Sequence, residues 1–142
     1  MSDLRALLDA GLRPGVYRWP SGLPAERVRS IVAEAGWSLV LLDTTQVHDK
    51  TGFLDVCATA FDLPRWFGRN WDALADSLSD RSTGEPEVVL WEGWRDLLDH
   101  DHDTVDVALQ IFAEDVNESG QLRVFLREAD DAPDLVSSFP VV

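Results

Sequence analysis

Short apolar runs alternate with amphipathic segments along this chain of 142 residues. The run 37–43 is almost continuously apolar, as expected for a strand covered on both faces of a sheet. Other segments repeat apolar residues at helical spacing. Strands that alternate with helices predict an α/β fold with a small parallel sheet packed with helices. The predicted strands are residues 15–19, 37–43, 87–92 and 122–127, and the predicted helices span about 2–10, 24–35, 50–61, 70–78 and 104–117.

The segment 63–78 predicts a tight aromatic turn followed by a short helix. Asn70 is a good first cap for that helix, because its side chain can accept a hydrogen bond from an unpaired amide at the helix start. Trp71, Leu74 and Leu78 then recur at i, i+3 and i+7. One stripe of this short helix is therefore expected to face the core.

Two aspartates, Asp72 and Asp76, share another stripe of the same helix. Like charges at i and i+4 cost a few tenths of a kcal/mol in an isolated helix. The positive helix N-terminus favours Asp72, but Asp76 lies a turn further in, where that benefit has faded. Residues 70–80 contain no lysine or arginine to offset the pair. A charge pair that the fold does not require suggests a cation supplied by a partner.

This segment resembles the barstar family, which are intracellular protein inhibitors of secreted microbial ribonucleases. The resemblance extends over about residues 37–127, and it is looser in the strand 87–92 and the helical stretch 109–114 than in the motif. The residues that carry it most specifically are Leu63, Pro64, Gly68, Asn70, Trp71, Asp72, Ala73, Leu74 and Asp76.

The resemblance implies a site that copies the phosphate of an RNA substrate. Carboxylates on a helix can form charge-assisted hydrogen bonds with the arginines of a ribonuclease active site. Asp76 matches the family position that inserts deepest, Asp72 and Glu114 match supporting acidic positions, and Trp66 matches an aromatic that packs on the enzyme's histidine. The implied partner-binding residues are Trp66, Gly68, Asn70, Asp72, Ala75, Asp76 and Glu114.

Each of these residues also has a purely structural interpretation. The two aspartates of the motif helix could form a solvated helix face, and Trp66 could fill the core. Asp115 could replace Glu114 after a small shift in register. Arg69 and Ala75 depart from the family pattern, since the first brings a positive charge and the second replaces a large aromatic. Such changes could reshape the surface for a different ribonuclease.

The resemblance also divides the chain into regions. It implies a single barstar-like domain with a family core of three parallel strands over residues 37–127. Residues 1–36 add a strand and a helix, and right-handed crossover rules place that strand in the same sheet, most simply beside residues 37–43. This extension either adds a contact surface or only covers an edge of the sheet. The tail, residues 128–142, is either a docked arm or disordered.

Composition narrows the range of partners. The formal charge is -14, from 26 acidic and 12 basic residues, which disfavours nucleic acid and anionic membranes and favours a cationic protein. The first fifteen residues contain no long apolar run, so we expect no secretion signal and a cytoplasmic protein. The single cysteine, Cys57, excludes an internal disulfide, and its spacing predicts a buried, unreactive thiol.

Other polar clusters give weaker signals. The run 99–103 contains aspartate and histidine, but an extended loop would point alternate residues to opposite sides, so we predict no metal site. A helix start with Asp103 as N-cap and Asp106 at N3 explains the run better. His48 fits a loop residue. No cofactor motif or catalytic set is recognisable, so we predict neither a cofactor nor enzymatic activity.

The sequence therefore favours a ribonuclease inhibitor that binds one secreted, cationic ribonuclease or nuclease toxin in a one-to-one complex. Two alternatives stay open at this point. One is an immunity protein against a toxin that is not a ribonuclease, and the other is a barstar-like interaction scaffold that inhibits nothing.

Overall fold

Four parallel strands form a single sheet in the order β1-β4-β3-β2. The computed structural model describes residues 4–64, 67–80, 85–119, 122–127 and 133–142. The α/β architecture and all four predicted strands are confirmed. The strands are β1 (Gly15–Trp19), β2 (Ser38–Asp43), β3 (Glu87–Glu92) and β4 (Leu122–Arg127), and the helices are α1 (Leu4–Asp9), α2 (Ala25–Glu34), α3 (Lys50–Ala60), α4 (Trp71–Ser79), α5 (Trp94–His100) and α6 (His102–Ser119).

The first strand lies at the opposite edge from the one that the sequence predicts. β1 pairs with β4, and Val16 lies opposite Val124, whereas β2 pairs only with β3 within the described residues. The reason lies in the burial of β4, where Val124, Phe125 and Leu126 are all nearly inaccessible to solvent. A strand that is apolar on both faces suits the interior of a sheet. The extension therefore covers the edge of β4 that the three family strands would leave open.

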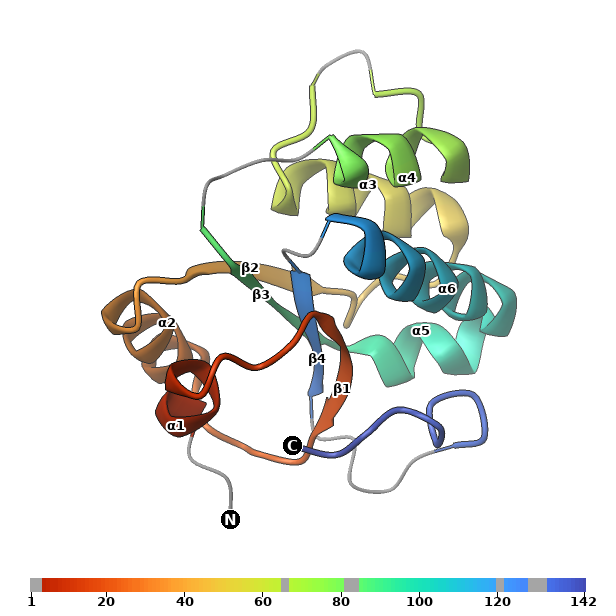
Figure 1. Cartoon of the computed structure of the whole chain (residues 1–142). Coiled ribbons are helices and arrows are strands. Elements are labelled where there is room, and N and C mark those ends of the chain that lie inside the picture. Colours follow the sequence, from red (N-terminus) through yellow and green to blue (C-terminus); the bar gives the residue numbers. More distant parts are fainter. Residues whose placement is uncertain (1–3, 65–66, 81–84, 120–121, 128–132) are drawn as a thin grey trace.

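Helices cover both faces of the sheet (Figure 1). On one face, α3, α4, α5 and α6 contribute to a core around Phe53, Trp91 and Phe112. On the other, α1 and α2 of the extension pack against Phe125 and neighbouring residues. Successive strand residues point to opposite faces, so each strand supplies side chains to both cores. None of the described helices combines the length and the apolar character needed to cross a membrane.

The end of the tail is a docked arm, which decides between the two alternatives for residues 133–142. Val136 is fully buried. The Arg18 amide donates to the Pro140 carbonyl over 2.8 Å, and the Val142 amide donates to the Arg18 carbonyl over 3.0 Å. These bonds attach the tail to the outer edge of β1. Residues 128–132 lie outside the described residues.

The sequence interpretation missed α5 and placed the start of α6 too late. Trp94 and Leu97 fall at i and i+3 and are buried, so this short helix is anchored by its own apolar face. Asp101, rather than Asp103, caps α6, because its carboxylate accepts from the Thr104 amide over 3.1 Å. The polar run 99–103 is therefore the junction of two helices and not an extended loop.

Candidate partner-binding site

The turn before α4 fixes the position and direction of that helix. The Asn70 side-chain oxygen accepts from the Ala73 amide over 2.8 Å, which confirms the predicted cap. The Asn70 amide group also donates to the Gly68 carbonyl over 3.3 Å. A Cβ atom at Gly68 would lie 3.1 Å from the Asn70 side-chain nitrogen, so a larger residue would crowd the cap. Gly68 and Asn70 thus have a structural role at the helix start.

One side of α4 anchors the helix in the core. Leu74 and Leu78 are almost completely buried, and the half-buried Trp71 ring lies 5.8 Å from the ring of Phe53. The Lys50 ammonium lies 5.5 Å from the centre of the Trp71 ring, within the range of a cation–π contact. The apolar stripe predicted from the spacing is confirmed, and it holds α4 as a rigid element.

The aspartates of α4 are exposed on its other side. Asp72 and Asp76 are both exposed, and Ala75 between them is partly buried. Within the described part of the chain, neither carboxylate takes part in an ion pair. The helix therefore presents two carboxylates one turn apart to solvent, with the backbone behind them fixed by packing.

Arg69, which departs from the family pattern just before α4, has its positive charge neutralised within the protein. Its guanidinium donates to the Asp55 carboxylate over 2.7 Å, and both side chains are about half exposed. Arg69 also has a φ of 48°, which belongs to the left-handed region. Its charge is therefore compensated by α3, so it does not offset the acidity of α4.

The third acidic residue of the predicted site lies on a neighbouring element. α4 packs against α6 on the same side of the sheet (Figure 1), and α6 carries Glu114, which is exposed. Trp66 lies outside the described residues, and so does the side chain of Asp115, the alternative to Glu114. The structure thus places Asp72, Ala75, Asp76 and Glu114 on two adjacent helices.

Sequence reasoning missed one aromatic contact next to these elements. The rings of His48 and His100 stack with a centroid distance of 3.8 Å and an angle of 19°. His48 does lie in a loop, as predicted, but it closes that loop onto the end of α5. No local signal could have revealed this pair, because the two residues are far apart in sequence.

Among the described residues, no three histidine, cysteine, aspartate or glutamate side chains are grouped to hold a metal ion.

The thiol of Cys57 is inert in the folded protein. Its side chain is fully buried on α3, and burial raises the pKa of the thiol strongly. A neutral, inaccessible thiol is a poor nucleophile. The predicted buried cysteine is therefore confirmed.

The fold and the site together define a class of protein. It is a small α/β protein with a parallel sheet, in which an acidic helix is anchored to the core by its apolar side. Comparison with known protein families matches residues 37–128, about two thirds of the chain, to the family described as Barstar (barnase inhibitor). The chain belongs to the barstar family. No curated protein matches the chain significantly. The family region begins just before β2, so β1, α1 and α2 are an addition to the matched core.

Proposed function

We propose that this protein inhibits a basic, barnase-like ribonuclease by occupying its active site with α4. The membership of the barstar family supports the proposal. The observation that carries it is the exposed pair Asp72 and Asp76, which has no ion-pair partner within the described residues. A fold gains little from such a pair, whereas a cationic partner gains two charge-assisted contacts from it.

The proposed mechanism is competitive occlusion. A ribonuclease gathers arginine, lysine and histidine side chains around the phosphodiester that it cleaves, and carboxylates can take the place of that phosphate. Asp76 inserts deepest, while Asp72 and Glu114 contact cationic groups at the rim and Trp66 packs on the enzyme's histidine. Because packing already fixes α4, association loses less conformational entropy than a mobile loop would lose.

Shape and charge suggest how the partner is recognised. Gly68 and Asn70 fix the turn that leads into α4. The small side chain of Ala75 leaves room between the two carboxylates for a side chain of the enzyme. The net charge of -14 favours encounter with a cationic protein. One acidic helix can occupy one active site, so the complex is one-to-one. The proposal includes a cytoplasmic location, where an inhibitor protects the cell that makes a ribonuclease.

Titration of a barnase-like ribonuclease with the purified protein tests the proposal. Cleavage of RNA should stop at about one molecule of inhibitor per molecule of enzyme, and a large excess of RNA should slow the onset of inhibition. The protein alone should hydrolyse no RNA. Asp76→Asn should weaken binding at least about thirtyfold, which corresponds to about 2 kcal/mol for a central contact residue.

Glu26→Gln on α2 is the matched control, because it removes the same charge from an exposed site on the other face of the sheet. It should bind normally. Asp76→Asn should also unfold at the same urea concentration as the parent protein or slightly higher, since it removes a like-charge contact. If Asp76→Asn bound the ribonuclease with normal affinity, Asp76 would not belong to the binding site and the proposed site would be wrong. Binding without inhibition would instead favour an interaction scaffold, and neutralisation of a toxin that is not a ribonuclease would favour an immunity protein of another kind.

A further inference from the structure

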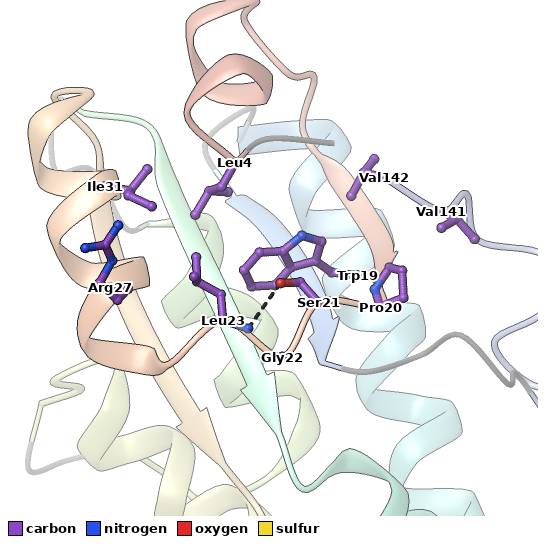
Figure 2. A pocket seen from close by; sticks show the side chains of 10 residues that line it. All are labelled: Leu4, Trp19, Pro20, Ser21, Gly22, Leu23, Arg27, Ile31, Val141 and Val142. Carbon is purple, nitrogen blue, oxygen red and sulfur yellow. Dashed lines mark hydrogen bonds between the residues drawn. The ribbon is translucent and has the colours of Figure 1, made fainter. Parts of the chain in front are cut away.

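A second candidate site lies on the face of the sheet opposite α4. A cavity of about 860 Å³ opens between α1, α2, the loop after β1 and the end of the tail. Figure 2 shows the Trp19 indole in the middle of this cavity, with Arg27 and Ile31 of α2 on one side and Val141 and Val142 of the tail on the other. The volume falls in the range of pockets that bind small molecules.

The lining of the cavity is mostly apolar and has one cation. Its polar side-chain groups are the Trp19 indole N–H, the Ser21 hydroxyl and the Arg27 guanidinium. The Ser21 oxygen accepts from the Leu23 amide over 3.1 Å, which leaves the hydroxyl proton available to a ligand. Arg27 is exposed and takes part in no ion pair among the described residues. No acidic side chain lines the cavity, although the chain has 26 acidic residues.

The charge of the surrounding segment differs from that of the rest of the protein. Residues 1–36 have a formal charge of +1 in a chain of -14. Two acidic residues of this segment, Asp9 and Glu34, both pair with Arg5, over 3.0 Å and 3.6 Å. These contacts neutralise part of the negative charge of α1 and α2, while Arg27 keeps its own charge. The field there can accept an anion, which the acidic face around α4 would repel.

We propose that this cavity binds a small amphipathic monocarboxylate, with its alkyl chain against Trp19 and its carboxylate at Arg27. A single uncompensated guanidinium matches a single negative charge, and the apolar walls between Leu4, Leu23 and Val142 match a hydrocarbon chain. A cationic ligand would find no acidic side chain in the lining. This site lies apart from α4, so it does not depend on the proposed inhibition of a ribonuclease.

Titrations of the full chain with octanoate and with 1-octanol, followed by NMR, test this assignment. Octanoate should shift the Trp19 indole N–H signal and the Leu23 amide signal in a saturable way. It should bind roughly fivefold more tightly than 1-octanol, because only the carboxylate can pair with Arg27. Arg27→Gln should remove this preference and leave the weaker binding of the alcohol. Arg29→Gln, an exposed arginine of the same helix that does not line the cavity, should keep the preference.

Three results would overturn the proposal. The first is an absence of saturable shifts at Trp19 with either probe. The second is an unchanged preference for octanoate in Arg27→Gln. The third is a dimer in sedimentation experiments that octanoate does not dissociate, because the occupant of the apolar surface next to the exposed Val141 would then be a second copy of the chain.

Discussion

Gly93 joins β3 to α5, and its replacement tests how strictly this junction is packed. Its φ is 74°, in the left-handed region, and it precedes the first residue of α5. A Cβ atom built on Gly93 would lie 2.3 Å from the Thr45 amide nitrogen and 2.6 Å from the Thr45 Cα. The neighbouring hydroxyl of Thr44 donates to the Gly93 carbonyl over 2.8 Å and accepts from the Trp91 indole over 2.9 Å. Any movement of this turn therefore disturbs buried hydrogen bonds.

Gly93→Ala should lower the free energy of unfolding by roughly 3 kcal/mol. About 1 kcal/mol arises from placing a Cβ atom in the left-handed region. About 2 kcal/mol more arises because two backbone segments must separate by about 1 Å to relieve the overlap, which a well-packed core resists. The variant should still fold, since domains of this size typically have about 5–15 kcal/mol of stability.

Gly36→Ala is the control, because Gly36 has a φ of 82° and a Cβ atom there would meet nothing within 4 Å. It should lower the free energy of unfolding by only about 1 kcal/mol. Urea unfolding followed by tryptophan fluorescence measures both variants under the same conditions. Equal losses in the two variants would refute the argument, since the backbone strain is shared and the overlap with Thr45 is not.

Two further predictions concern stability. Asn70→Ala should lower the free energy of unfolding by about 1 kcal/mol in urea, because the Ala73 amide loses its acceptor at the start of α4; an unchanged midpoint would contradict this role of the cap. Burial raises the pKa of the Cys57 thiol in the folded protein, whereas the thiol of the unfolded chain loses its proton near pH 8.5. Stability should therefore be full below about pH 8.5 and fall at higher pH, and Cys57→Ala should reduce that fall.

Local signals in the sequence were sufficient for most of the secondary structure. Gly11 and Gly36 adopt positive φ two residues after the last residues of α1 and α2, where a helix end was predicted, and Asn70 caps α4 as its position suggested. These features depend on residues within one or two turns of each other. Signals of this range can be read without knowledge of the rest of the chain.

The position of β1 depended on information that no local window contains. Apolar periodicity predicts that a segment is a strand, but it does not say which edge of the sheet the strand joins. The edge is decided by β4, which is buried on both faces. Part of that burial comes from tertiary contacts, because Tyr17 and Trp19 of β1 pack against Phe125 of β4.

The start of α6 was missed for a different reason. Several aspartates in the run 99–103 could each act as a cap, and the hydrogen bond from the Thr104 amide identifies Asp101 as the one that does.

The exposed aspartates of α4 are a feature that the fold tolerates but does not need. Among the described residues, Arg69 before α4 pairs with Asp55, and Lys50 of α3 lies over Trp71, so neither of these cations neutralises Asp76. Leaving an exposed like-charge pair on a helix costs only a few tenths of a kcal/mol, whereas a carboxylate at the centre of an interface can contribute about 2 kcal/mol or more to binding. Because the cost is so much smaller than the gain, an acidic stripe on a well-anchored helix can persist in a marginally stable protein. This reasoning favours a partner-binding role for α4 over a merely solvated face.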